Sequence, residues 1–274
     1  MPYKQKLKTP SLNPKKKGSV ASVEAGKNVI DFSAKEESML LKISKDLLPK
    51  FKCFCSSPEL IMMFVYMKCR FSLSYRDLEE MMQIRGAVID HSTLQRWVRR
   101  FARLIRDRVR ARKKPVNGSW RMDETYIKLN GKWVYLYRAV DKEGNTIDFL
   151  LRAKRDAVAA KAFFRKAIKE NGRPKKVTVD KSGSNKAALD YCNQDVTEEE
   201  KIEIRQIKYL NNIIEQDHRF IKKRTRPTLG FKSFQSAKAT IDGIESVRMI
   251  QKGQIKGQTA NNSAFGNFVS LMAA

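Results

Sequence analysis

Apolar residues recur with the period of an α-helix in the first half of the chain. Ser57 followed by Pro58 is a combination that commonly starts a helix, and this helix is expected to run to about Arg70. Ser74, with an acid three residues later, predicts a second helix that stops near Gly86. The pattern therefore predicts two short helices in succession.

A third, longer helix is expected to begin after Asp90, which would cap it. Its apolar face has helical spacing and consists of Leu94, Trp97, Val98, Phe101, Leu104 and Ile105. Its opposite face is polar and consists of Gln95, Arg96, Arg99, Arg100, Arg103 and Arg106. Such a helix can pack onto a core by one face and offer cations to a ligand on the other.

Three helices ending in one with an arginine face are typical of a helix-turn-helix DNA-binding domain. The side chains nearest the start of the third helix would meet base edges in the major groove. Arg103, Arg106 and Arg110, farther along, would mainly contact phosphates. The DNA-binding residues expected on this helix are Thr93, Gln95, Arg96, Arg99, Arg100 and Arg103.

The alternative for this helix is a solvated surface face, which is what most charged stretches are. Between Ser92 and Lys114, however, there are 10 basic residues and one acid. Charges at this density repel one another unless a polyanion lies against them. We therefore favour DNA contact.

The pattern changes from helices to strands after Pro115. Asn130 and Gly131 form a two-residue turn signal between the first two strands. The expected strands are residues 120–129, 132–140, 146–151, 177–179 and 202–209, and the expected helices are residues 156–170, 184–191 and 213–224. Three antiparallel strands followed by helix, strand, helix, strand and helix is the order of the ribonuclease H-like α/β fold.

Four segments follow from these patterns. Residues 1–52, with 12 Lys and 5 acids, are expected to form a basic and partly disordered arm. Residues 53–114 would form the all-α helix-turn-helix domain, and residues 115–254 the ribonuclease H-like domain with its mixed five-stranded sheet and flanking helices. Residues 255–274 would be a C-terminal tail.

Charge narrows the class of partner. The 274 residues carry 56 Lys and Arg against 29 Asp and Glu, a formal charge of +27. For a folded basic protein, nucleic acid is the commonest partner that such an excess serves.

Membrane insertion and a disulfide framework are not expected. The longest apolar run, Leu60–Met67, is far shorter than a membrane span. The four cysteines, Cys53, Cys55, Cys69 and Cys192, are too few for a disulfide framework in a chain of this size. A zinc site from three of them with His91 is an alternative, but one residue between Cys53 and Cys55 is closer than zinc ligands usually stand.

Three carboxylates fall at informative places in the expected fold. Asp123 lies within the first strand, Asp180 follows the buried fourth strand, and Glu215 begins the last helix. If these elements adjoin, the three acids converge and can hold two divalent cations. Such a pair of cations can activate the attacking oxygen and stabilise the leaving oxygen in phosphodiester cleavage.

At these residues the sequence resembles the bacterial DDE transposases of insertion sequence family six. The resemblance covers about 200 residues, from near Ser57 to Gly253, and 34 residues separate Asp180 from Glu215, as that family's pattern demands. It is carried jointly by residues 74–81 (SYRDLEEM), 121–128 (RMDETYIK), 131–141 (GKWVYLYRAVD), 179–181 (VDK), 208–212 (KYLNN) and 215–219 (EQDHR).

The resemblance implies a function and a site. Asp123, Asp180 and Glu215 would be the catalytic triad and the ligands of two Mg²⁺ ions, with Mn²⁺ as a substitute, and Lys222 would contact the DNA end. The enzyme would bind terminal inverted repeats, cleave the element ends and transfer them into target DNA. It would act as a homodimer or larger assembly on double-stranded DNA, in the bacterial cytoplasm at the nucleoid. A catalytically inactive or regulatory DNA-binding relative is the alternative.

Residues beside the triad are expected to play other roles. Glu124 and Asp217 should point away from the triad because they stand one and two residues from its members. His218 shares a helix face with Glu215 and would orient DNA or a carboxylate, or be structural. Trp120 and Trp133 are expected to be packing residues. Asn185 departs from the family pattern, which often has an aromatic residue there.

Overall fold

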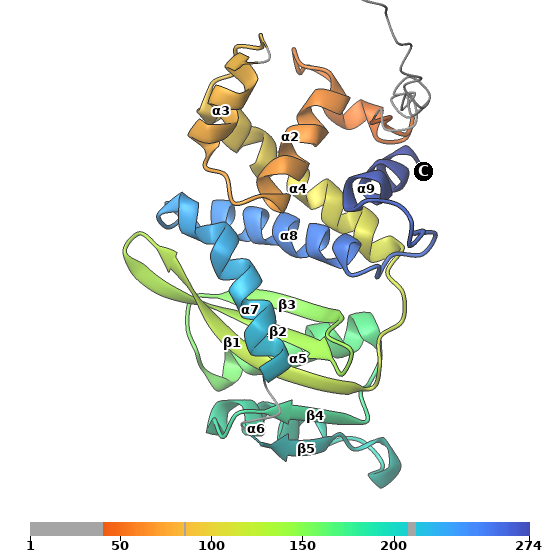
Figure 1. Ribbon diagram of the computed structural model, residues 1–274. Helices are drawn as coiled ribbons and strands as arrows, with labels where there is room; N and C mark the ends of the chain where they lie inside the picture. Colours follow the sequence, from red (N-terminus) through yellow and green to blue (C-terminus); the bar gives the residue numbers. More distant parts are fainter. Residues whose placement is uncertain (1–40, 85, 208–211) are drawn as a thin grey trace, which may run out of the picture. The chain divides into compact units, whose positions relative to one another are not determined.

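The computed structural model describes residues 41–84, 86–207 and 212–274 (Figure 1). Most of the expected basic arm, residues 1–40, therefore lies outside the described residues. In chain order the elements are η1 (Leu48–Phe51), α2 (Pro58–Arg70), α3 (Tyr75–Ile84), α4 (His91–Ala111), β1 (Ser119–Leu129), β2 (Lys132–Asp141), β3 (Thr146–Arg152), α5 (Ala157–Asn171), β4 (Lys176–Val179), α6 (Gly183–Cys192), η2 (Glu198–Glu200), β5 (Glu203–Gln206), α7 (Asn212–Thr225), η4 (Arg226–Thr228), α8 (Phe234–Gln251) and α9 (Ala264–Ala273).

Local side-chain signals start the first helices where the sequence predicts. The Ser57 hydroxyl accepts a hydrogen bond from the Leu60 amide at the start of α2. Before α3, Ser74 and Asp77 form a reciprocal pair, each side chain accepting from the other's amide at 2.7 and 3.0 Å. The Asp90 carboxylate caps α4. The three predicted helices are confirmed.

The five strands form one mixed sheet in the order β3-β2-β1-β4-β5. β1, β2 and β3 are antiparallel neighbours, and β4 and β5 run parallel to β1. Asn130 and Gly131, both with positive φ, make the predicted hairpin turn. β5 is shorter than the predicted strand. The prediction covered residues 202–209, whereas the strand is Glu203–Gln206, and residues 208 and 209 lie outside the described residues. The predicted ribonuclease H-like fold is confirmed.

Each face of the sheet has its own hydrophobic core. On one face, Trp120, Met122 and Tyr137 pack with residues of α5 and α6. On the other face, Ile127 and Leu136 join a larger core that extends into the helices on that side, including α4 and α8. In Figure 1, α7 crosses this second face and α8 lies between the sheet and the N-terminal helices. Side chains of β1 and β2 that point to this second face therefore meet α7 and α8.

The two C-terminal helices were not predicted, although α8 is a central packing element. α8 contacts α2, α4, α7, α9 and β3. Gly243 of α8 lies against α2 and α4 so closely that an added Cβ would stand 2.4 Å from Cys69 Sγ and 3.1 Å from Ala102 Cβ. α9 falls in the predicted C-terminal tail and buries Phe268, among other residues. Burial also raises the pKa of the Cys69 thiol to about 12, so this cysteine is a packing residue.

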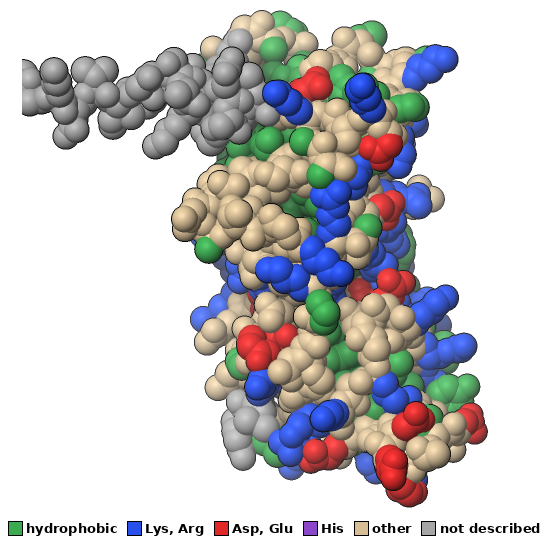
Figure 2. Space-filling model, turned by 90° about the vertical axis from the view of Figure 1, so that its right-hand side faces the viewer, with side chains coloured by type: hydrophobic (Ala, Val, Ile, Leu, Met, Phe, Trp, Pro, Cys, Tyr) green, Lys and Arg blue, Asp and Glu red, His purple; other side chains and the backbone are tan. Residues whose placement is uncertain are grey.

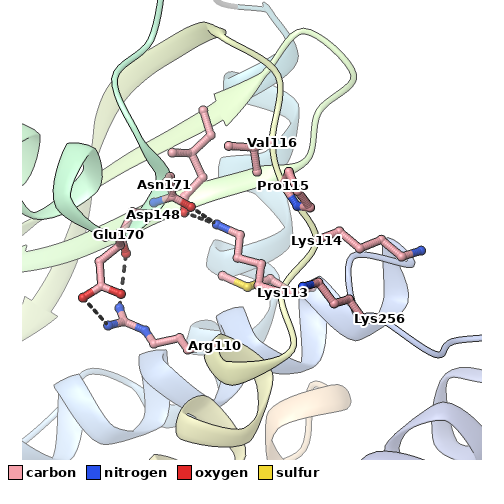
Figure 3. A pocket seen from close by; sticks show the side chains of 11 residues that line it. Arg110, Lys113, Lys114, Pro115, Val116, Asp148, Glu170, Asn171 and Lys256 are labelled. Carbon is pink, nitrogen blue, oxygen red and sulfur yellow. Dashed lines mark hydrogen bonds and ion pairs between the residues drawn. The ribbon is translucent and has the colours of Figure 1, made fainter.

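The C-terminal end of α4 is tied to the sheet domain by ion pairs and hydrogen bonds (Figure 3). Arg110 lies 3.3 Å from Asp148 of β3 and 3.9 Å from Glu170 of α5. Lys113 donates to the Asn171 side chain at 2.5 Å. One turn earlier, Arg106 pairs with Asp242 of α8 at 2.7 Å. Both arginines therefore have carboxylate partners within the chain, with which a phosphate would have to compete, and their expected phosphate contacts stay a prediction.

Positive charge is not confined to α4. Figure 2 shows Lys and Arg side chains spread along one whole face of the molecule, from the helical part to the sheet domain. Within the described ranges, no helix is long and apolar enough to cross a bilayer.

Candidate active site

Strand pairing brings two of the three predicted acids together. β1 pairs in parallel with β4, with Arg121 opposite Thr178. Asp123 stands two residues after Arg121, and Asp180 stands two residues after Thr178. Carboxylate oxygens of Asp123, Glu124 and Asp180 all lie within 4.8 Å of one another. We call these three residues the carboxylate cluster.

Glu124 was not expected in this cluster. It follows the alternation of β1, because it faces the core that holds Trp120 and Met122 whereas Asp123 faces α7. Both carboxylates nevertheless reach the end of the sheet near Asp180. The Glu124 side chain is only 2% exposed. Burial raises its pKa, an effect that Arg155 opposes and the nearby Asp123 and Asp180 reinforce.

Arg155 places a positive charge among the carboxylates. It follows β3, and its guanidinium lies 3.0 Å from Asp180 and 3.4 Å from Glu124. The side chain is 34% exposed, so it can move without disturbing the core. Sequence reasoning missed this residue, because nothing in the local pattern indicates that the chain after β3 returns to the end of β4.

Asn185 holds Asp180 in place. Asn185 is fully buried in the first turns of α6, and its Nδ2 donates to Asp180 Oδ1 at 3.1 Å. The Ser182 amide donates to the same oxygen at 3.1 Å. The departure from the family pattern at position 185 therefore supplies a hydrogen bond to a predicted triad member.

His218 reaches the other predicted strand acid. Its Nε2 lies 3.3 Å from Asp123 Oδ2, and its Nδ1 lies 3.3 Å from the Arg138 guanidinium. Because arginine can only donate, Nδ1 is the acceptor and Nε2 carries the proton. Burial and Arg138 lower the pKa of His218, while its hydrogen bond to Asp123 raises it. His218 is thus arranged as a neutral donor to Asp123.

Arg138 is the centre of a buried ion network behind His218. It stands directly across from Asp123 in the β1–β2 register and is inaccessible to solvent. Its guanidinium contacts Glu245 of α8 at 2.5 and 3.0 Å and Asp217 of α7 at 2.7 Å. Burial alone would raise the pKa of Asp217, but Arg138 and Lys252 hold it well below its usual range. An arginine in the middle of an apolar strand was the signal that could have revealed this network.

Glu215 lies apart from the carboxylate cluster. It is exposed in the first turn of α7 and is not among the residues whose oxygens lie within 4.8 Å of one another. It stands three residues before His218, so the two share a helix face about 5 Å apart. α7 therefore presents Glu215 toward the same side of the sheet as Asp123. The four residues before α7 lie outside the described residues.

Lys222, two turns farther along α7, is exposed and lines a pocket with Tyr126 and Trp133 of the β1–β2 hairpin. Trp133 is 60% exposed, so the expectation that it is a packing residue is wrong, whereas Trp120 is buried as expected. Lys223, the residue after Lys222, is also exposed but does not line this pocket.

The predicted DNA-binding residues of α4 face solvent. Gln95, Arg96, Arg99, Arg100 and Arg103 are exposed, and Thr93 is partly so. The apolar face of the helix is buried, as the sequence predicts. The exposed residues are therefore free to contact a ligand along one side of α4.

The chemistry of the carboxylate cluster suits a divalent cation. Carboxylate oxygens are the ligands that hard ions such as Mg²⁺, Ca²⁺ and Mn²⁺ prefer. The buried Glu124 Oε1 has no hydrogen-bond partner among the described residues, and such an oxygen is available to a cation. The zinc alternative has no such support, because no cysteine joins a potential metal-binding group within the described residues.

Comparison with known proteins identifies the class. A family model described as "DDE domain" matches residues 117–254, half of the chain. The chain belongs to this family, and it is a DDE transposase of insertion sequence family six. Its enzyme class is polynucleotidyl transfer.

Particular relatives come from Staphylococcus aureus. The transposase for insertion sequence-like element IS431mec of strain N315 is 42% identical over 184 residues, which are 67% of this chain and 80% of the relative. The transposase for insertion sequence element IS257 in transposon Tn4003 matches with the same identity and coverage.

Among solved structures, the chain is similar to retroviral integrase domains. The catalytic core domain of HTLV-2 integrase in complex with magnesium (dimeric form) matches at 16% identity and a TM-score of 0.39, over 54% of this chain and 100% of that chain. The catalytic core domain of BIV integrase matches at 15% identity and a TM-score of 0.37, over 56% of this chain and 95% of that chain.

Proposed function

We propose that this transposase binds the terminal inverted repeats of its insertion sequence, cleaves the element ends, and joins the exposed 3′ ends to target DNA. The observation that carries the proposal is the carboxylate cluster, formed by the middle of β1 and the residue that directly follows β4. Two acids that the family pattern assigns to catalysis, Asp123 and Asp180, stand in it on adjacent parallel strands of a ribonuclease H-like sheet.

Asp123, Asp180 and Glu215 would hold two Mg²⁺ ions, or Mn²⁺ in their place. When bound, the ions supply activation of the attacking oxygen and stabilisation of the leaving oxygen. Glu124 is close enough to assist in holding them. Glu215 is the one proposed ligand that lies outside the carboxylate cluster. It is included because it shares a helix face with His218, which contacts Asp123.

The chain's own residues would orient this site. His218 donates to one oxygen of Asp123 and leaves the other oxygen available to a ligand. Asn185 donates to Oδ1 of Asp180, whose Oδ2 is held by the Arg155 guanidinium at 3.0 Å, so a cation at Asp180 would have to displace that guanidinium. Arg138 holds His218 by its second nitrogen. Hydrogen bonds of this kind keep the ligand oxygens aimed and cost little reorganisation during the reaction.

The exposed face of α4 would read and grip the repeats. Thr93, Gln95 and Arg96 near its start would meet base edges, while Arg99, Arg100 and Arg103 would contact the phosphates. Lys222 would hold DNA near the cleavage point by its charge. We expect a homodimer or larger assembly on double-stranded DNA, because two element ends must be processed together, and hence a location at the bacterial nucleoid in the cytoplasm.

The test uses the full-length protein with a duplex that carries the terminal repeat flanking its gene. In Mg²⁺, Asp123→Asn, Asp180→Asn and Glu215→Gln should each lose end cleavage by at least about a thousandfold, while binding of the duplex changes less than about threefold. Glu124→Gln should cleave more slowly than wild type but measurably.

A matched control is Asp190→Asn, which alters an exposed acid of α6 and should cleave as wild type does. Substantial cleavage by any of the three triad variants would remove that residue from the triad. Wild-type protein that binds the repeat but never cleaves it would instead identify a regulatory DNA-binding relative.

A further inference from the structure

A shallow pocket of about 430 Å³ lies at the hairpin end of β1, beyond the point where β4 stops pairing with it. One wall comes from β1 and β2 and the other from α7 and the segment after it. Its lining residues are Tyr126, Ile127, Lys128, Trp133, Lys222, Thr225, Arg226, Thr228, Leu229, Gly230 and Phe231.

Large apolar side chains are exposed together in this pocket. Tyr126 is 48% exposed, Trp133 60% and Leu229 92%. The rings of Tyr126 and Trp133 stand 6.2 Å apart at 68°, so they form a corner with two aromatic surfaces. Exposing a cluster of apolar side chains to water is unfavourable in free energy, and such a cluster commonly marks a binding site.

The backbone that presents Leu229 is held in an unusual conformation. Leu229 has φ of 51°, in the left-handed region that a branched side chain rarely adopts, and Gly230 follows at 100°. Phe231 pins this segment to the hairpin, donating to the Lys128 carbonyl at 2.8 Å and accepting from the Asn130 amide at 2.9 Å. A strained backbone conformation of this kind is unfavourable in free energy, and such conformations cluster at functional sites.

Charge and position indicate the ligand. The pocket is lined by Lys128, Lys222 and Arg226, and none of its described lining residues is acidic. Tyr126 follows Asp123 by three residues of strand, a backbone separation of about 10 Å, and the two side chains point to opposite faces of β1. Because β4 pairs only with Ser119–Arg121, an anionic polymer held at the carboxylate cluster would reach the pocket across the edge of β1 beyond that pairing.

We propose that this pocket receives a DNA base that has left the double helix beside the cleaved phosphate. The inference rests on the proposed function. The base would stack on Trp133 or Tyr126, and Lys222 and Arg226 would hold the phosphates on either side of it. Aromatic rings bordered by cations are the usual recognition surface for unstacked bases. Removing one base from the stack would also open the duplex where the carboxylates must reach the backbone.

Binding of the full-length protein to a set of end duplexes tests the proposal. Each duplex carries one mispaired base at a position within three nucleotides of the cleavage point, and binding is measured by fluorescence anisotropy without divalent cations. Wild type should prefer at least one mispaired duplex over the paired one by about tenfold, because the unpairing cost is already met. Trp133→Ala should weaken binding to that duplex by about five- to a hundredfold, and Trp133→Phe should restore most of the loss.

Tyr191→Ala, a change at an exposed aromatic residue of α6, is the matched control and should bind as wild type does. No mispair preference in wild type, or a preference that survives in Trp133→Ala, would overturn the proposal. A Trp133→Ala protein that keeps the preference but loses self-association in sedimentation would assign the pocket to a second copy of the chain. Wild-type cleavage of the paired duplex in Mg²⁺ is measured in parallel, since its absence counts against the proposed function and not against the pocket alone.

Discussion

Arg138→Met should destabilise the protein strongly, because it removes the cation that neutralises a buried carboxylate. Glu245 is fully buried, and Arg138 is its ion-pair partner at 2.5 Å. Among the described residues no other cation lies within 4.0 Å of Glu245, whereas Asp217 keeps Lys252 at 2.9 Å and Arg248 at 3.3 Å. Removing one member of a buried pair costs about 3–5 kcal/mol. For a chain of this size that corresponds to a melting temperature lower by about 6–20 °C.

The free energy of unfolding is measured by urea denaturation followed by circular dichroism. The matched control is Arg205→Met, which breaks an exposed pair with Glu203 and should cost less than about 1 kcal/mol. Arg138→Met with Glu245→Met removes both charges and should recover at least half of the lost stability. A loss below about 1 kcal/mol for Arg138→Met, or no recovery in the double variant, would refute the reasoning.

End cleavage separates this structural role from the orientation of His218. The double variant regains stability, but Nδ1 of His218 still lacks the guanidinium that fixes its proton on the nitrogen facing Asp123. Loss of such an orienting partner commonly costs about 10- to 100-fold in activity. We therefore expect the double variant to fold well and cleave slowly. A stable double variant that cleaves at the wild-type rate would show that Arg138 serves only the fold.

Three further predictions concern single side chains. Arg155→Ala should lower the Mn²⁺ concentration for half-saturation, measured by electron paramagnetic resonance, by about two- to fivefold, because the guanidinium competes for Asp180 and Glu124; unchanged binding would contradict this. Lys222→Ala should slow end processing with the Mg²⁺ requirement unchanged, while Lys223→Ala, outside the pocket, should have little effect; equal rates would reduce Lys222 to surface charge. Burial lowers the pKa of Lys68 from 10.5 to about 8. Between these two pH values the unfolded state binds more protons than the folded state, so the free energy of unfolding should rise as the pH goes from 8 to 10.5. Lys68→Met should flatten that rise when it is measured by urea denaturation.

The fold could be predicted where local chemistry decides it. Ser57, Asp90 and the Asn130–Gly131 turn each act through hydrogen bonds or backbone angles within a few residues, and all were confirmed. The helix α8 was not predicted because most of its residues are buried, polar ones included, so the sequence shows no alternation between a polar and an apolar helix face there.

The site could be predicted only in part, since its supporting residues are set by tertiary contacts. Asp123 and Asp180 were found because one lies within a recognisable strand, the other directly follows one, and a family pattern names both. Glu124, Arg155 and Asn185 reach the same place from a strand, a loop and a helix, which no spacing in the sequence records. Trp133 was misassigned because an aromatic residue in a strand usually packs, whereas this one stands beside the β1–β2 turn and is 60% exposed.

α8 links the predicted DNA-binding helix to the catalytic sheet within a single turn. Asp242 accepts a hydrogen bond from Arg106 of α4, and Gly243 lies against Ala102 of the same helix. Glu245, two residues later, holds Arg138 in the sheet. Arg106, Asp242 and Glu245 are all largely shielded from solvent, and one turn of helix is stiff, so α8 couples the position of α4 directly to that of Arg138, which stands across from Asp123 in the sheet.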